Sequence, residues 1–255
     1  QRAAVDSALR DCTDQQKQLL KWRIYEVGNP KQNNEQTEDI LKHTDCLLAI
    51  EHLGVAQDGK KYSMKGTDKS HLNANTHDLF LKRNKDTQVA LSIGDGGNEL
   101  GMGLVRDAVV KHIPQGELIA DTIACDSLIP CGVSNWGGHG LAAGLTLYRL
   151  SMLSPESVID EIFPDTPRRE WEHLSEENFS KILHEFLTSH ESIMDVSEES
   201  DMLDAILAKG SVDGIRGTVE RSVDNFDYDE LHVKVLNEIR EVCVKQIKEW
   251  IKNEE

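Results

Sequence analysis

A glycine-rich segment, residues 94–103, holds the side chains whose types and spacing are best suited to chemistry. Its polar residues are Asp95, Asn98 and Glu99, and a carboxylate can act as a general base, a general acid or a cation ligand. Backbone N–H groups of such a loop at a helix start can bind an anion or an oxyanion. The structural alternative is a tight turn in which Asp95 or Asn98 only caps the helix.

The same segment lacks two common phosphate-binding patterns. If the dinucleotide pattern GxGxxG begins at Gly94, the third glycine position is taken by Glu99. A Walker A loop is excluded because no Gly-Lys-Ser/Thr sequence follows. The segment therefore predicts a catalytic or ligand-binding turn and not a nucleotide loop.

A second glycine-rich turn, residues 134–140, reads Ser-Asn-Trp-Gly-Gly-His-Gly. Asn135 can donate an amide N–H to an oxyanion, and Trp136 can shield a site from water. His139 carries an imidazole that titrates near neutral pH and can move a proton. A glycine-rich helix entry with a buried tryptophan and an incidental histidine is an equal alternative.

Two further segments carry charged residues beside predicted turns. Glu51 follows a short apolar run, so an α/β sheet would place it at the carboxyl edge, although a surface loop is nearly as well supported. In residues 211–217, Asp213 and Arg216 could face an anionic ligand, and an ordinary turn is the alternative.

Metal and thiol chemistry receive weaker support from the sequence. His71 and His77 lie near Asp68 and Asp78, but their spacing matches no zinc pattern. The chain has five cysteines without a CxxC pair, which favours buried structural cysteines in a reducing compartment.

The overall charge restricts the partners. The 255 residues carry a formal net charge of -17, which would repel nucleic-acid backbones and anionic membrane surfaces. No apolar run approaches the roughly 18 residues of a membrane span. We therefore expect neither nucleic acid nor membrane as a partner.

Short apolar runs predict the elements that position these segments. Strands are expected at residues 46–50, 88–93 and 118–124, and helices at 104–113 and 141–150. This alternation is typical of an α/β fold, and we predict a three-layer α/β/α domain with a largely parallel sheet. Ligands of such domains bind outside the carboxyl ends of the strands, where both glycine-rich turns would lie.

We predict that residues 1–255 form a single α/β domain with a mainly helical carboxy-terminal part. Residues 1–45 are expected to form helices and loops, with a loop over 28–38. Residues 46–150 form the core of the sheet, and residues 151–255 form helices that cover it. Helices are expected at 178–193 and 202–208, joined by a solvated acidic stretch at 191–201, and a last packing helix spans 231–251.

Five segments of this chain resemble the carboxy-terminal domain of the D-glutamate cyclase family. They are Ile50-Glu51-His52, Tyr62-Ser63-Met64-Lys65-Gly66, residues 93–103, Gly132-Val133-Ser134-Asn135-Trp136-Gly137 and Ser211-Val212-Asp213-Gly214. The resemblance extends over residues 46–224, and the two glycine-rich segments in this order are its most specific part.

The resemblance implies conversion of D-glutamate to 5-oxo-D-proline and water. For this reaction we predict Asp95 or Glu99 as the base and His139 as the acid. The other candidates would bind substrate or oxyanion. They are Gly94, Gly96, Gly97, Asn98, Ser134, Asn135, Trp136, Glu51 and Asp213. No cofactor is identified, but a divalent cation held by Asp95 or Glu99 would serve instead to neutralise the substrate.

The resemblance also implies an additional amino-terminal domain of the same protein as a partner, a small amino-acid substrate and a location in the mitochondrial matrix. Two other functions remain open at this point. One is a non-catalytic ligand-binding or regulatory domain of a two-domain enzyme, and the other is a metal-dependent hydrolase or phosphatase that uses the same loop.

Overall fold

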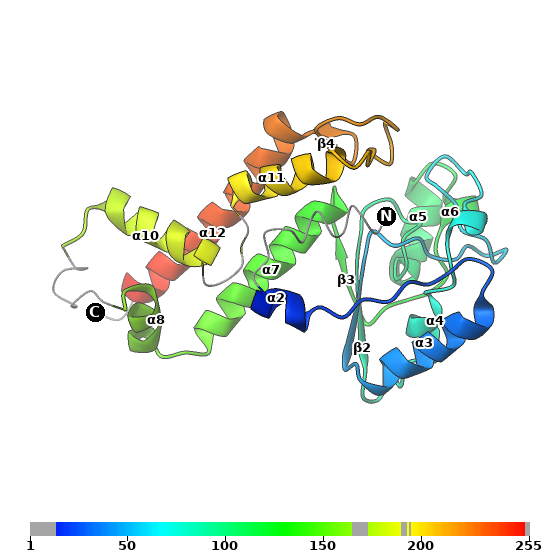
Figure 1. The fold of residues 1–255 in the computed structure, drawn as a ribbon, viewed down its shortest axis with the longest axis horizontal. Helices are drawn as coiled ribbons and strands as arrows, with labels where there is room; N and C mark the ends of the chain where they lie inside the picture. Colours follow the sequence, from blue (N-terminus) through cyan, green and yellow to red (C-terminus); the bar gives the residue numbers. More distant parts are fainter. Residues whose placement is uncertain (1–13, 165–172, 190–192, 194, 253–255) are drawn as a thin grey trace. The chain divides into compact units, whose positions relative to one another are not determined.

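The computed structural model describes residues 14–164, 173–189, 193 and 195–252 (Figure 1). The chain divides into two compact units, which we call the sheet unit (Gln18–Gly138) and the helical unit (the described residues from His139 onward, with 14–17). The boundary falls inside the segment 46–150 that the sequence predicts as the sheet core. Helix α7 (Ser134–Ser151) crosses this boundary, and helix α2 (Asp14–Leu19) crosses the other one, between residues 17 and 18.

The sheet unit is built on three parallel strands, β1 (Cys46–Ile50), β2 (Val89–Gly94) and β3 (Ser127–Pro130), in the order β1-β2-β3. Ile50 at the end of β1 pairs with Ile93, and Gly94 at the end of β2 pairs with Pro130. The carboxyl ends of the strands therefore meet at one edge. The predicted α/β class with a parallel sheet is confirmed, as are the first two strands.

Short helices accompany this sheet. They are α3 (Pro30–Lys42), η1 (Ser70–Leu72), α4 (Asp78–Lys82), η2 (Gly103–Val105), α5 (Arg106–His112) and α6 (Gly116–Ile119). Alternate strand residues such as Leu47 and Ala90 point to one side, where they pack with Phe80 and Leu100 in a buried core. This core fixes the ends of β1 and β2, from which the site residues extend.

The predicted loop over residues 28–38 is wrong, because helix α3 begins at Pro30. Asn29 is its N-cap, and the Asn29 side chain accepts a hydrogen bond from the Gln32 N–H. Proline fits the first turn of a helix since its missing N–H would have no partner there. The Asn-Pro pair therefore starts a helix where we predict a turn.

The predicted strand over residues 118–124 is also wrong. Helix α6 ends at Ile119, and the third strand begins only at Ser127. Ile119, Ala120 and Ile123 of this run are buried, but Ala124 pairs in isolated bridges with Gly101 and Met102 of the glycine loop and not with β2. Burial alone does not distinguish a strand from an extended segment that covers a loop.

The helical unit contains the remaining elements. They are the main part of α7, α8 (Pro155–Ile162), α10 (Glu176–Ser189), α11 (Val196–Leu207), the antiparallel pair β4 (Ser222–Val223) and β5 (Phe226–Asp227), the π-helical turn η3 (Tyr228–His232) and α12 (Val233–Lys252). No helix in the described part of the chain is long and apolar enough to cross a bilayer.

The last helix packs as its apolar periodicity predicts. Val244, Ile247 and Ile251 of α12 are buried in one core with residues of α7, α8 and α10, such as Leu150 and Leu183. A stripe of apolar residues at helical spacing gains free energy mainly by burial against such neighbours.

Two predicted boundaries in this region need correction. Helix α7 begins at Ser134 and not near residue 141, so the second glycine-rich turn forms the first turns of a helix. Helix α11 begins at Val196, within the stretch that we predict as a solvated connection. Asp195 and Glu198 form a capping box there, which satisfies N–H groups at the helix start.

Candidate functional site

The glycine loop, residues 94–103, begins at the end of β2 and folds back against this strand, where the Ser92 hydroxyl donates to the Leu100 carbonyl. Gly97 has a φ of +102° and Gly101 a φ of +99°, which L side chains rarely adopt. A Cβ at Gly97 would collide with Val109, and one at Gly101 would collide with Ser92. These glycines are therefore required by the path of the loop, which aims the side chains of Asp95 and Glu99.

Glu99 is folded back onto its own loop. Its carboxylate accepts hydrogen bonds from the Gly96 N–H at 2.9 Å and from the Gly97 N–H at 2.7 Å. The side chain is buried, and this burial raises the pKa of Glu99, as does the charge of Asp95, against the opposing effect of the loop amides. An oxyanion could use these two N–H groups only after Glu99 moved away from them.

Asp95 joins the glycine loop to the start of α7. Its Oδ2 accepts a hydrogen bond of 2.8 Å from the Ser134 backbone N–H. A carboxylate at this position satisfies one of the unpaired N–H groups of the first turn and faces the positive end of the helix dipole. The predicted proximity of the two glycine-rich segments is thereby seen at Asp95 and Ser134.

Glu51 reaches the same place from the end of β1. It has a positive φ of 48°, which is uncommon for a residue with a side chain. Its Oε2 accepts a hydrogen bond of 2.6 Å from the Ser134 hydroxyl, across 83 residues of sequence. Backbone strain in this conformation costs about 1–3 kcal/mol and is often found at functional sites.

Three carboxylates thus converge at the carboxyl edge of the sheet, and we call them the carboxylate cluster: Glu51, Asp95 and Glu99. One oxygen from each lies within 4.8 Å of the others. Their combined charge favours a cationic group, either an ammonium or a hard divalent ion such as Mg²⁺. Mutual repulsion also favours a shared proton, in agreement with the raised pKa of Glu99.

Asn98 and Asp121 anchor this loop to the segment after β1. Asn98 Nδ2 donates to the Tyr62 carbonyl at 2.7 Å, while its Oδ1 is buried without a partner among the described residues. Asp121 accepts from the Val55 and Gly101 N–H groups, both at 2.8 Å. Asp121 is not among the predicted site residues, because a lone aspartate in an apolar run carries no motif.

The remaining predicted residues of the sheet unit lie around this cluster. Gly94 is the last residue of β2, and its carbonyl accepts the Cys131 N–H at 3.1 Å. Asn135 is exposed and Trp136 is half-buried in the first turn of α7. Burial and the nearby Asp95 raise the pKa of the Cys131 thiol, which opposes a thiolate nucleophile here.

His139 and Asp213 belong to the helical unit. Asp213 accepts hydrogen bonds from the Ile215, Arg216 and Asn225 N–H groups and from the Ser222 hydroxyl, so its carboxylate holds a turn together. His139 Nε2 lies 2.9 Å from a carboxylate oxygen of Glu199. The contacts of both side chains in the structure are thus with residues of the helical unit.

Comparison with known proteins defines the class of this chain. The family described as D-glutamate cyclase-like, C-terminal, matches residues 2–240, and the chain belongs to this family. It is also 29% identical over 206 residues to D-glutamate cyclase, mitochondrial, of Homo sapiens. That match covers 80% of this chain but 30% of the human protein, so the chain spans less than a third of that relative's length.

Proposed function

We propose that the carboxylate cluster is the substrate site of a D-glutamate cyclase, which closes D-glutamate to 5-oxo-D-proline and releases water. The observation that carries this proposal is the convergence of Glu51, Asp95 and Glu99 within 4.8 Å. Membership of the D-glutamate cyclase-like family supports the choice of substrate.

The reaction sets clear demands on the site. The α-amino nitrogen forms a bond with the γ-carboxyl carbon, and one C–O bond of that carboxyl breaks. Two protons leave the ammonium group and end on the departing oxygen, which leaves as water. Such a site needs a base for the ammonium, an acid for the oxygen and donors for the tetrahedral oxyanion.

The two loop carboxylates fit the base and acid roles. We assign the base to Asp95, which is only half-buried and lies beside the helix start. We assign the acid to Glu99, because burial raises its pKa and so favours a carboxyl that holds a proton. Two carboxyls in unlike environments are a common way to divide acid and base work.

Other groups would orient the substrate. The substrate ammonium would lie against Glu51 and Asp95, and the unpartnered Asn98 Oδ1 can accept from it. The positive end of α7 at Ser134 would offset the negative charge of a substrate carboxylate. Asn135 remains a candidate donor to the oxyanion. His139 has no role in this mechanism because its Nε2 is hydrogen-bonded to Glu199.

A divalent cation in the carboxylate cluster is the alternative to a proton on Glu99. Oxygen ligands suit Mg²⁺, Ca²⁺ or Mn²⁺, and such an ion would neutralise the γ-carboxylate directly. Loss of turnover after chelation, restored by Mg²⁺ or Mn²⁺, would assign the ion. Chelator-sensitive turnover of phosphate esters without cyclisation would instead favour a metal-dependent hydrolase and reject the cyclase.

The first experiment follows 5-oxo-D-proline after the chain is mixed with D-glutamate. Asp95→Asn should lower the rate by about 10²–10⁴-fold, which is typical for loss of an acid or base group. Asp86→Asn, at an exposed turn outside the cluster, is the matched control and should keep full activity. Equal rates for Asp95→Asn and the unmodified chain would remove the assignment.

A longer form of the protein, with the amino-terminal domain that we expect, is a necessary comparison, because the chain spans 30% of its human relative. Turnover by the longer protein but not by this chain would indicate a ligand-binding or regulatory role and reject an autonomous enzyme. The mitochondrial matrix is the location that we propose for it, in line with the name of that relative.

A further inference from the structure

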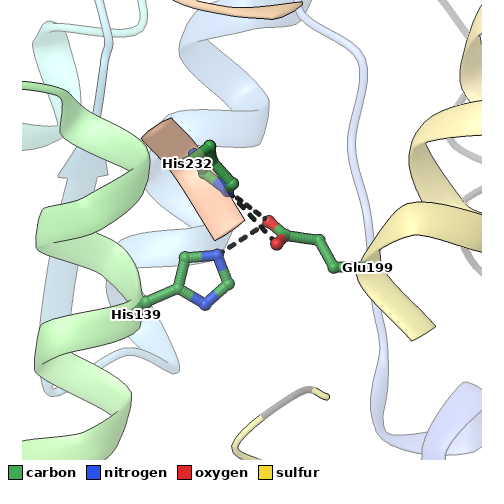
Figure 2. Close-up of side chains that lie close together, drawn as sticks. All are labelled: His139, Glu199 and His232. Carbon is green, nitrogen blue, oxygen red and sulfur yellow. Dashed lines mark hydrogen bonds and ion pairs between the residues drawn. The ribbon is translucent and has the colours of Figure 1, made fainter. Parts of the chain in front are cut away.

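A second group of ionisable side chains lies in the helical unit, and we call it the His–Glu–His cluster: His139, Glu199 and His232 (Figure 2). His139 Nε2 lies 2.9 Å from Glu199 Oε1. His232 Nε2 lies 3.0 Å from the same oxygen and 3.2 Å from Glu199 Oε2. Both imidazoles therefore point one nitrogen at a single carboxylate.

Three separate elements supply these side chains. His139 comes from α7, Glu199 from the first turns of α11, and His232 from the π-helical turn η3 just before α12. The capping box at Asp195 fixes the start of α11 and with it the position of Glu199. Single π-helical turns are rare and are frequently found at functional sites.

The cluster is largely withdrawn from water. The His232 side chain is 0% exposed, that of Glu199 is 7% exposed and that of His139 is 22% exposed. Burial raises the pKa of Glu199, but hydrogen bonds and charge from the two histidines together outweigh burial and lower it to about 2.

A second layer holds His232 in place. The Tyr228 ring stacks on the His232 ring with centroids 5.2 Å apart, and the Arg221 guanidinium lies 4.8 Å from the Tyr228 centroid. Arg221 is itself bound to Asp204 and Asp229. These contacts restrict the orientation of the His232 ring, which a ligand to a metal ion also requires.

We propose that the His–Glu–His cluster binds a divalent transition-metal ion of the Zn²⁺ class. Metal bonds to histidine nitrogen and carboxylate oxygen are about 2.0–2.2 Å, so neighbouring ligand atoms lie roughly 3 Å apart. The contacts of 2.9 and 3.0 Å from the two Nε2 atoms to Glu199 Oε1 match that spacing. Two imidazoles and one carboxylate are an established ligand set for zinc and for non-haem iron.

The partial exposure of His139 gives an ion a route to the cluster. Gly138 and Gly140 flank this histidine in α7, and apart from their own helix backbone and chain neighbours no atom of the described residues lies within 4 Å of the position that a Cβ would take at either. Three protein ligands leave at least one coordination position for water or another small ligand. The alternative is a cluster in which protonated histidines alone neutralise Glu199.

The test uses the 255-residue chain purified without a histidine tag and stripped of metal. Titration with Co²⁺ should give a saturable visible absorption band at one ion per chain, and Zn²⁺ should abolish it by displacement. Zinc should also raise the melting temperature, because an ion that binds only the folded state stabilises it. Cysteine ligands would add a thiolate charge-transfer band, and its appearance would contradict the assignment.

Two variants make the test specific. His139→Gln removes a partly exposed ligand and should weaken Zn²⁺ binding by more than the roughly 10–100-fold that loss of an outer partner causes. His184→Gln is the matched control, since His184 Nε2 lies 3.2 Å from Glu241 in a pair that is more exposed than the His–Glu–His cluster. Zn²⁺ affinity that is unchanged in His139→Gln, or no saturable Co²⁺ band in the unmodified chain, would overturn the proposal.

Discussion

The two clusters place a glutamate in opposite surroundings. Burial and the carboxylate of Asp95 raise the pKa of Glu99 in the sheet unit, although the two backbone N–H groups that it accepts from oppose this rise. Glu199 in the helical unit faces two imidazoles, and its pKa is lowered to about 2. Both side chains are buried. The partners, and not burial alone, therefore decide whether a buried carboxyl holds its proton.

This difference separates two kinds of chemistry. A buried carboxyl with a raised pKa is suited to proton transfer, which the cyclisation of D-glutamate requires. A buried carboxylate between imidazoles is suited to holding a cation. Substitutions that remove one carboxyl at a time can therefore test the role of Glu99 in proton transfer and that of Glu199 in holding a cation separately.

The largest effect is expected on turnover. Glu99→Gln should lower the rate of 5-oxo-D-proline formation by about 10²–10⁴-fold, because glutamine cannot donate a proton as the acid must. The fold should survive, since a glutamine oxygen can keep one of the two bonds to Gly96 and Gly97. A rate within threefold of the unmodified chain would exclude Glu99 as the acid.

The second effect is on stability and concerns Glu199. Glu199→Gln in the metal-free chain should lower the free energy of unfolding by about 3–5 kcal/mol, because it removes the buried carboxylate that both imidazoles contact. Glu241→Gln breaks the exposed pair with His184 and should cost less than about 1 kcal/mol. Urea unfolding measures the free energy of unfolding of both variants. Equal losses of stability in the two would contradict the proposed difference between the buried cluster and the exposed pair.

The two glutamates should also give opposite slopes of stability with pH. The folded-state pKa of Glu199, about 2, lies below the ordinary 4.5, so its contribution is present above pH 4.5 and is lost as pH falls towards 2. The raised pKa of Glu99 acts in reverse, so stability declines as pH rises from 4.5 through the folded-state pKa. Urea unfolding at a series of pH values measures both effects. Glu199→Gln should reduce the loss of stability below pH 4.5, and Glu99→Gln should reduce the decline above pH 4.5.

The smallest effect is expected at Ser134. Ser134→Ala removes the hydroxyl bond to Glu51 but keeps the backbone N–H bond to Asp95, so stability should fall by only about 1 kcal/mol. Ser151→Ala, at the far end of the same helix, is the control, because its exposed hydroxyl donates to the Tyr148 carbonyl three residues before it. A loss at Ser134 no larger than the control would show that the Glu51 contact contributes nothing.

Much of the sheet unit is predictable from sequence. The apolar runs of β1 and β2 and the glycine loop between β2 and α5 follow from local pattern. The strand expected at 118–124 is wrong because burial beside the glycine loop gives the same apolar pattern as a strand. The start of α11 carried a readable signal, the Asp195–Glu198 capping box.

The sites themselves are less predictable. Asp95 and Glu99 lie on one loop, so local sequence finds them together. The bond between Ser134 and Glu51 spans 83 residues, and that between His232 and Glu199 spans 33. Such contacts depend on how whole elements pack, which no local spacing encodes. Glu199 and His232 are therefore not among the residues predicted from sequence, and His139 is predicted for the other site.

The most direct test of the central claim is a carbon-13 NMR titration of the glutamate side-chain carboxyl carbons in the metal-free chain. The Glu99→Gln and Glu199→Gln spectra assign the two signals. We predict that Glu99 titrates above the ordinary 4.5 and that Glu199 titrates far below it. A Glu99 signal that titrates at or below 4.5 would contradict the account, because that carboxyl could not serve as the acid.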